Sequence, residues 1–155
     1  VLDEWSTLVG LRWPWSRVGP RQVHGITRRS LRGAPKADGV LRELSARLDG
    51  AIFTAHNVEF DARFIERAAA RADVPLSLDR RLCTLQLSRR LDPDRQLTHG
   101  LADVCARYHV PLERHHDALS DARATAGVLP HLLAAYGVLD EDDLGPLYSP
   151  VPLSA

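Results

Sequence analysis

Short apolar runs alternate with amphipathic stretches along the 155 residues of this chain. Runs rich in apolar and β-branched residues predict strands at 1–9 (VLDEWSTLV), 51–55 (AIFTA) and 79–83. Apolar residues at helical spacing, together with turn signals, predict helices at 35–48, 59–72, 84–91, 98–108 and 118–136. Strands that alternate with helices are typical of an α/β domain.

Two of the predicted helices have candidate N-cap residues, and one of these two helices also has an apolar stripe. In the second helix, Phe60, Phe64 and Ala68 have the spacing of an apolar stripe. Asn57 is placed to cap the amino end of that helix, and Asp117 is placed to cap the last helix.

Two segments lack such a pattern. Trp13-Pro14-Trp15 lies in a loop, and we expect this loop to pack against the core. Residues 139–155 are acidic and then proline-rich, which is typical of a loose terminal segment. We therefore expect one domain at 1–138 and a tail at 139–155.

Amino-acid composition argues against a membrane-spanning protein and limits the ways in which an anionic substrate could be held. Apolar residues make up 45% of the chain, and no apolar run approaches the ~20 residues that span a bilayer. We also find no signal peptide, and we expect a cytoplasmic protein that does not act at a membrane. Basic and acidic residues balance at 20 each, so an anionic substrate must be held locally by a metal or a few arginines. Cys83 and Cys105 have no metal-ligand spacing and are expected to be buried free thiols.

The first stretch with candidate chemistry is TAHNVEFDARF, residues 54–64. It places His56 and Asn57 in the turn after a buried strand, and Asp61 in the first turn of the following helix. The carboxyl ends of strands in α/β sheets are where sites gather. An acid in the first turn of a helix also offsets the helix dipole, so Asp61 alone does not define a site.

The second stretch is ERHHDALSDARATAG, residues 113–127. A capping role explains Asp117, but it explains Asp121 less well and His116 not at all. His116 and Asp121 therefore remain candidates for chemistry.

Together these stretches resemble motifs of the DEDDh family of 3′–5′ exonucleases, which includes the proofreading epsilon subunit of bacterial DNA polymerase III and RNase T. AHNVEFDARF resembles the second motif of the family and HHDALSDARATA the third. VHGIT, at 23–27, and LADVCARY, at 101–108, are similar to further family signatures. The order and separation of these motifs agree from Val1 to about Tyr136.

The resemblance implies a ribonuclease-H-like three-layer α/β fold with a mixed sheet. It also implies hydrolysis of phosphodiester bonds from the 3′ end of DNA or RNA, with two divalent ions, Mg²⁺ or Mn²⁺, as cofactors. Single-stranded or 3′-end nucleic acid is then the partner, and a DNA polymerase is a further candidate partner.

Carried over position by position, the resemblance assigns a role to seven residues. Asp61 and Asp121 are expected metal ligands, and His116 is the expected general base. The expected substrate-binding and supporting residues are His24, Ile26, Asn57 and His56.

The first family motif, D-x-E, supplies the other two acids and is absent from this sequence. Asp3 and Glu4 are adjacent, and residues 1–9 resemble the third strand of the family instead. We therefore expect the first two strands, with the D-x-E motif, to lie ahead of Val1.

Two alternatives stay open. One is a non-catalytic nucleic-acid-binding or partner-docking domain that has lost the D-x-E motif. The other is a different metal-dependent phosphohydrolase in which the histidines bind Zn²⁺. DNA and RNA, and roles in proofreading, repair and RNA trimming, are all compatible with the motifs.

Overall fold

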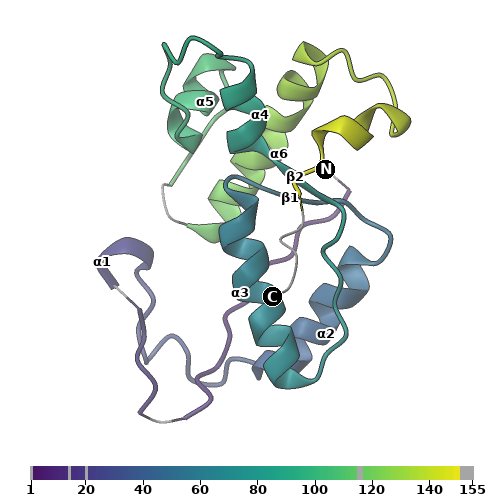
Figure 1. Ribbon diagram of the computed structural model, residues 1–155. Coiled ribbons are helices and arrows are strands. Elements are labelled where there is room, and N and C mark those ends of the chain that lie inside the picture. The colour runs from purple at the N-terminus through teal and green to yellow at the C-terminus, as the bar shows by residue number, and fades with distance from the viewer. Residues whose placement is uncertain (1, 14, 20, 115–116, 151–155) are drawn as a thin grey trace.

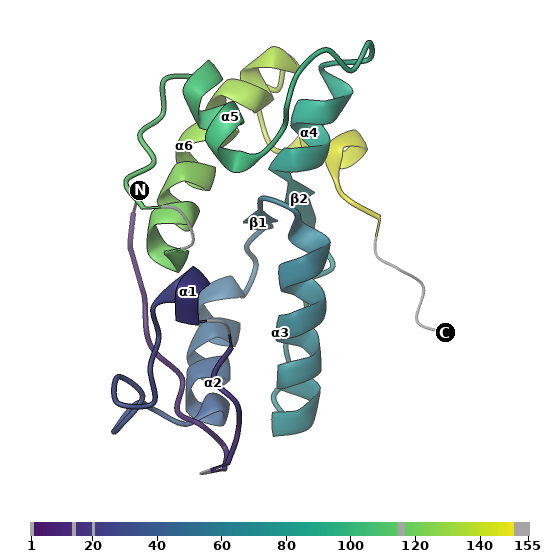
Figure 2. The ribbon, with the colours of Figure 1, turned by 90° about the vertical axis from the view of Figure 1, so that its left-hand side faces the viewer.

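The computed structural model describes residues 2–13, 15–19, 21–114 and 117–150. Its helices are α1 (Arg21–His24), α2 (Ala37–Leu48), α3 (Val58–Ala72), α4 (Thr84–Arg90), α5 (Leu101–Arg107) and α6 (Ala118–Ala135), followed by the 3₁₀ helix η1 (Asp142–Leu147). The strands β1 (Phe53–Ala55) and β2 (Arg81–Cys83) pair in parallel, with Phe53 opposite Arg81. Figures 1 and 2 show the sheet between two groups of helices, α2 with α3 and α4 with α5 and α6.

Helix α3 is the crossover that joins the two parallel strands, because parallel neighbours need a long connection. Arg81 ties this helix to β2 from inside the protein, with 1% of its side chain exposed. Its guanidinium lies 2.8 Å from Glu66 and 3.5 Å from Glu59, and its Nε donates to the Leu78 carbonyl at 2.7 Å. The charge of this buried arginine is thus met by two carboxylates of α3.

The larger core lies among α4, α5 and α6, where Leu87, Val104, Val128 and Leu132 are almost completely buried. A smaller cluster joins α2 to α3 through Leu41 and Ala69, with Val74 after them. The end of β1 and the beginnings of α3 and α4 lie between these two cores (Figure 2).

Most predicted elements are confirmed, but the strand predicted at 1–9 is wrong. Residues 2–9 have no regular secondary structure, and the sheet in the part of the chain that the structure describes contains only β1 and β2. Side chains hold the segment instead. Asp3 pairs with Arg47, and Glu4 accepts hydrogen bonds of 2.8 and 2.6 Å from Arg123. Sequence propensity cannot supply the neighbouring strand that makes an extended segment part of a sheet.

The apolar stripe predicted on α3 is wrong for its two phenylalanines, although its third member, Ala68, packs against the smaller cluster. Phe60 and Phe64 are 71% and 74% exposed, and the buried positions of α3 are small, among them Ala62 and Ala69. The glutamates that bind Arg81 lie on the same side of the helix as these buried alanines. Positions 59, 62, 66 and 69 share one helical face, which turns the two phenylalanines away from it.

The expectation of a loose segment from residue 139 onward is wrong as far as residue 150. Leu144 and Leu147 of η1 are buried in the larger core, and the Ser149 amide donates to the Arg81 carbonyl at 2.9 Å. The division of the chain at residue 138 remains a prediction. Among the residues described, no helix is long and apolar enough to cross a membrane.

Candidate active site at the carboxyl end of the first strand

The turn after β1 is built by His56 and Asn57. Asn57 has a left-handed backbone, with φ 72° and ψ 51°, a conformation that Asn adopts more readily than most residues. It occupies the N-cap position of α3, as predicted, but its side chain makes no capping hydrogen bond. Asn57 therefore contributes through its backbone, which makes the sharp turn that allows α3 to start directly after the strand.

His56 is held by both of its ring nitrogens. Nδ1 lies 3.0 Å from the Thr84 hydroxyl, and Nε2 lies 3.0 Å from the His99 carbonyl oxygen. Burial lowers the pKa of His56, and the charge of Arg89 acts in the same direction. The carbonyl of His99 and the charge of Asp121 oppose this lowering.

Asp61 lies one turn into α3 and is half-buried. Burial raises the pKa of this carboxyl, while a backbone hydrogen bond at Asp61 acts in the opposite direction. An ionised Asp61 therefore lacks full compensation for the water it has lost. A bound cation would provide that compensation.

Asp121 lies in the first turn of α6. Asp117 caps this helix, since its Oδ1 accepts from the Ser120 amide at 3.0 Å, and the predicted capping role is confirmed. The charge of Asp121 partly opposes the lowering of the His56 pKa and adds to the raising of the Cys105 pKa by burial.

The other predicted site residues lie farther along the same side or outside the described residues. The Ile26 amide donates to Nδ1 of His24 at 2.9 Å, which fixes the ring at the end of α1. Helix α1 lies beside the first turn of α6 in both views (Figures 1 and 2). His116 and its neighbour His115 lie outside the residues that the structure describes, and the role of His116 remains a prediction. Within the described ranges, no group of three or more His, Cys, Asp or Glu side chains could hold a metal ion.

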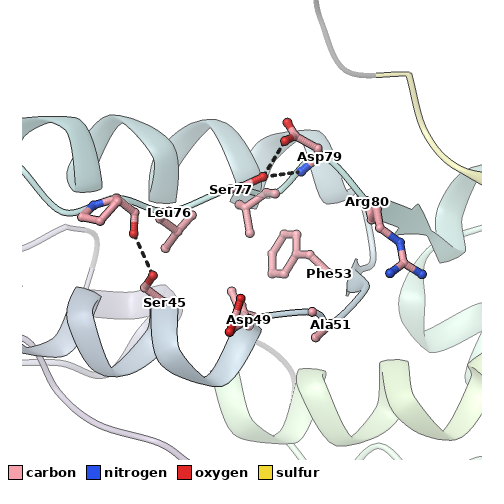
Figure 3. A pocket seen from close by; sticks show the side chains of 12 residues that line it. Ser45, Asp49, Ala51, Phe53, Leu76, Ser77, Asp79 and Arg80 are labelled. Atoms are coloured by element: carbon pink, nitrogen blue, oxygen red, sulfur yellow. Dashed lines mark hydrogen bonds between the residues drawn. The ribbon is translucent and has the colours of Figure 1, made fainter.

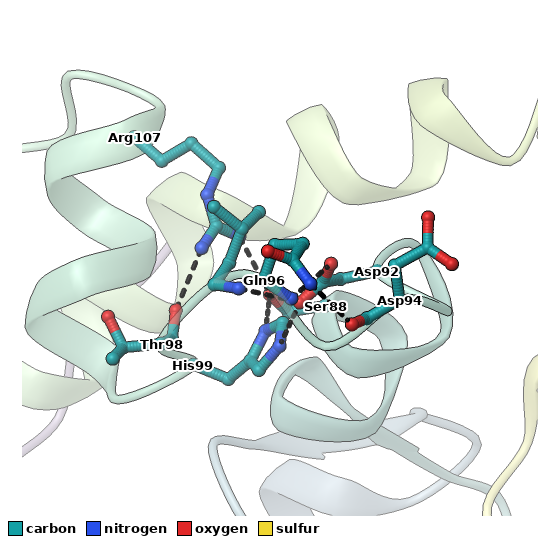
Figure 4. A network of polar contacts seen from close by, with 8 residues as sticks. Ser88, Asp92, Asp94, Gln96, Thr98, His99 and Arg107 are labelled. Carbon is teal, nitrogen blue, oxygen red and sulfur yellow. Dashed lines mark hydrogen bonds and ion pairs between the residues drawn. The ribbon is translucent and has the colours of Figure 1, made fainter.

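Sequence reasoning missed a polar network around His99, the residue whose carbonyl group is bound by His56 (Figure 4 shows the network). His99 has its Nε2 3.1 Å from Asp92 and its Nδ1 2.9 Å from the Ser88 hydroxyl, which also accepts from Arg107 at 3.1 Å. Backbone amides of Leu97 and Gln96, as well as His99, lower the pKa of Asp92 against the effect of burial.

This network fixes the position of the His99 carbonyl group, which accepts a hydrogen bond from Nε2 of His56. Arg107 adds a hydrogen bond of 2.8 Å to the Thr98 carbonyl next to it. No spacing rule links residues 88, 92, 99 and 107 in the sequence. The turn signal at Asp92-Pro93-Asp94 was visible, but its contact with His99 depends on the tertiary structure.

A separate hollow of about 630 Å³ lies at the other end of β1, beside Phe53 and the last turn of α2 (Figure 3). The Ser45 hydroxyl donates to the Pro75 carbonyl on one wall at 2.7 Å, and Ser77 binds Asp79 on another. Since the aspartates of the candidate site lie in the first turns of α3 and α6, this hollow is not part of that site.

Comparison with known proteins identifies relatives. Residues 20–129, more than half of the chain, match the model of the RNase T family, which is described as exonuclease. A protein of Mycobacterium tuberculosis (strain CDC 1551 / Oshkosh), provisionally named as a bifunctional exonuclease/endonuclease, is 36% identical over 140 residues, or 88% of this chain and 21% of the relative. DNA polymerase III PolC-type of Streptococcus suis (strain 98HAH33) is 37% identical over 129 residues, or 83% of this chain and 9% of the relative. The chain thus spans about a fifth or less of these two curated relatives.

The structure of Exonuclease X in complex with 5′ overhanging duplex DNA has the same fold. It aligns with a TM-score of 0.63 at 23% identity, covering 90% of this chain and 78% of that one. This confirms the predicted α/β fold of the ribonuclease-H type. On these matches, the chain belongs to the RNase T family of DEDDh-like exonucleases.

Proposed function

We propose that this protein is a metal-dependent 3′–5′ exonuclease whose site lies at the carboxyl end of β1. The observation that carries the proposal is the packing of α6 against β1, the strand from which α3 directly continues. Asp61 and Asp121 lie in the first turns of the two helices that contact this strand. Membership of an exonuclease family supports hydrolysis of a nucleic acid as the reaction.

The donor set fits Mg²⁺ or Mn²⁺. Both ions prefer carboxylate oxygens, and Mg²⁺ usually takes one or two carboxylates together with water and substrate phosphate. Asp61 and Asp121 would hold the ion, and the raised pKa of the half-buried Asp61 is the feature that a cation would relieve. When bound, the metal lowers the pKa of the attacking water and offsets charge on the phosphate oxygens.

The remaining residues of the chain would act around that ion. His116 would take the proton from the attacking water, which suits a side chain that titrates near neutral pH. His24 and Ile26 would contact the 3′-terminal nucleotide. His56 and Asn57 would hold the turn that sets the position of Asp61.

A non-catalytic nucleic-acid-binding domain is the second candidate. It is favoured by one observation, namely that the described residues provide no cluster of three metal-ligating side chains. Such a domain would bind single strands equally well with and without a chelator, and it would show no turnover.

The test is hydrolysis of a 5′-labelled single-stranded oligonucleotide in Mg²⁺, in Mn²⁺ and in EDTA. A ladder that shortens from the 3′ end supports the proposal, and an intact circular single strand shows that a free end is required. DNA and RNA oligonucleotides of one sequence compare the two substrates.

Substitutions of the two aspartates test whether hydrolysis takes place at this site. Asp61→Asn and Asp121→Asn should each reduce kcat by at least about 10- to 100-fold. Loss of a residue that only supports a metal ligand already costs this much, and loss of the ligand itself should cost no less. Asp94→Asn is the matched control, since Asp94 is exposed in the turn after α4. Turnover that survives both site substitutions would contradict the assignment, and its absence in the unsubstituted protein would favour the binding domain.

A further inference from the structure

The loop that carries Trp13 and Trp15 does not pack on the core, contrary to the expectation from sequence. The two indole rings stack on each other, with centroids 5.5 Å apart and planes 8° from parallel. They remain 50% and 74% exposed, and the Arg12 guanidinium lies 5.8 Å from the centroid of Trp13. Two large aromatic side chains that are ordered on each other and open to solvent form a ready-made flat surface for a planar ligand.

Beside this loop lies a hollow of about 1000 Å³ between residues 10–12, residues 28–38 and the end of α3. Five cationic side chains line it, namely Arg12, Arg28, Arg32, Lys36 and Arg71. Asp38 is the one acid among the described residues that line it, and its charge is partly offset by Arg42 at 3.3 Å. In a chain whose net charge is zero, this gathering of cations predicts an anionic ligand.

The aromatic pair and the cationic hollow are parts of one surface. Arg12 belongs to both, since it lines the hollow and approaches Trp13. The Arg28 guanidinium donates to the Ser16 carbonyl at 2.7 Å, and the Ser16 hydroxyl accepts from the Trp13 amide at 3.3 Å. At the base of the loop, the Gly10 amide donates to Pro35 at 2.8 Å. A ligand held by the arginines therefore lies within reach of the indoles.

We propose that this surface binds a segment of single-stranded nucleic acid, with bases stacked on Trp13 and Trp15 and phosphates on the arginines. Proteins that hold single strands without sequence preference combine these two elements, an aromatic platform and a cationic groove. The arginine fork also matches phosphate geometry. The choice of nucleic acid over other polyanions rests on the proposed function.

The distance between this surface and Asp61 determines which part of a bound strand the surface would hold. Arg71 follows Asp61 by ten residues on the same helix, a rise of about 15 Å. A strand with its 3′ end at Asp61 must therefore extend well beyond the first phosphodiester bond to reach the hollow. The surface would hold the strand upstream of the bond that is cut, and it would favour long substrates over dinucleotides.

Binding is tested with a dye-labelled single-stranded 20-mer in EDTA, which prevents turnover. Replacement of both indoles, Trp13→Ala with Trp15→Ala, should weaken binding by roughly tenfold or more. Arg32→Gln and Arg71→Gln should each reduce the slope of log K against log salt by about 0.7. Trp5→Phe and Arg95→Gln are the matched controls, and each should bind as the unsubstituted protein does. Arg95 belongs to the segment between α4 and α5, at the other end of the molecule from residues 10–38 (Figures 1 and 2).

The outcomes separate this inference from the proposed function. If the affinity for the 20-mer is unchanged by the indole and arginine substitutions, the inference is overturned, even if hydrolysis proceeds. Indole-dependent binding to phosphatidylserine vesicles, without binding to the oligonucleotide, also overturns it. If a dinucleotide and a 20-mer both stay intact in Mg²⁺ while the substitutions weaken binding as expected, the inference stands and the exonuclease proposal fails.

Discussion

The Nε2 atom of His56 lies 3.0 Å from the backbone carbonyl oxygen of His99, and this contact fixes the tautomer of the His56 ring. A carbonyl oxygen can only accept, so Nε2 carries the proton. Nδ1 then accepts from the Thr84 hydroxyl at 3.0 Å. Since both nitrogens are engaged, His56 suits a supporting role at the turn better than proton transfer to substrate, which leaves His116 as the candidate base.

The first prediction concerns the stability of this turn. His56→Ala should lower the free energy of unfolding by about 1–3 kcal/mol, because it leaves the fully buried Thr84 hydroxyl without its partner. Thr84→Val should recover part of that loss in the His56→Ala background. Urea unfolding of the two single variants and the double variant measures the coupling. Strictly additive losses would show that the two side chains do not depend on each other.

The second prediction concerns the pH dependence of stability. Because burial lowers the pKa of His56 in the folded state, the unfolded chain binds a proton more readily than the folded one. The stabilising effect of the neutral ring is therefore present above the ordinary histidine pKa of about 6.5 and is lost as the pH falls through the folded-state value. His56→Gln, which stays neutral, should lose less stability than the unsubstituted protein between pH 7.5 and pH 5 in urea titrations. Parallel losses would contradict the lowered pKa.

The third prediction is that Asp61 costs stability when no metal is bound. Its pKa is raised by burial, so the ionised form is disfavoured in the folded protein above the ordinary Asp pKa of about 3.9. In EDTA at pH 7, Asp61→Asn should therefore raise Tm. Mn²⁺ should then raise the Tm of the unsubstituted protein and leave that of the variant nearly unchanged. The exposed Asp94→Asn should leave both Tm values unchanged in the same thermal scans.

The fourth prediction compares a buried with an exposed ion pair. Glu66→Ala should cost about 2–3 kcal/mol, since it leaves the buried Arg81 with only the more distant Glu59 carboxylate. Glu43→Ala removes an exposed partner of Arg47 at 2.7 Å and should cost less than about 1 kcal/mol. Urea unfolding at neutral pH measures both losses. Equal losses would mean that the burial of Arg81 carries no penalty.

The fifth prediction uses two helical glycines. A Cβ atom at Gly127 in α6 would lie 2.6 Å from a methyl carbon of Val110, so Gly127→Ala should destabilise the protein by about 1–3 kcal/mol. Gly39 in α2 has open space at the same position, and Gly39→Ala should stabilise by about 0.5–1 kcal/mol. Opposite signs in thermal unfolding are the expected result. A neutral Gly127→Ala would show that the Val110 side chain can move aside.

Local pattern was sufficient to predict most helices and both strands of the sheet, because periodicity and turn residues encode them directly. It failed for the rotation of α3, where large apolar side chains suggested one face, whereas the buried face carries small residues and lies beside Glu59 and Glu66, which pair with Arg81. It also failed for residues 2–9, since a strand needs a neighbour and a propensity does not provide one.

The candidate site divides in the same way. The resemblance to a known family singled out Asp61 and Asp121 in two distant stretches, and the cap at Asp117 followed from local chemistry. The support of His56 by His99 and Asp92 could not be predicted, because those contacts form only after α4 and α5 have packed. The exposure of Trp13 and Trp15 likewise depends on what surrounds the loop in space.

The packing of η1 changes where this unit can safely be cut. The composition of residues 139–155 suggests a segment that could be removed without loss. However, Leu144 and Leu147 cover the apolar core formed by α4, α5 and α6, and the Ser149 amide is hydrogen-bonded to Arg81 in β2. A recombinant protein that stopped at residue 138 would expose an apolar surface next to β2. Such a protein would be prone to aggregation during expression, whereas one that ends at residue 150 or later keeps this interior closed.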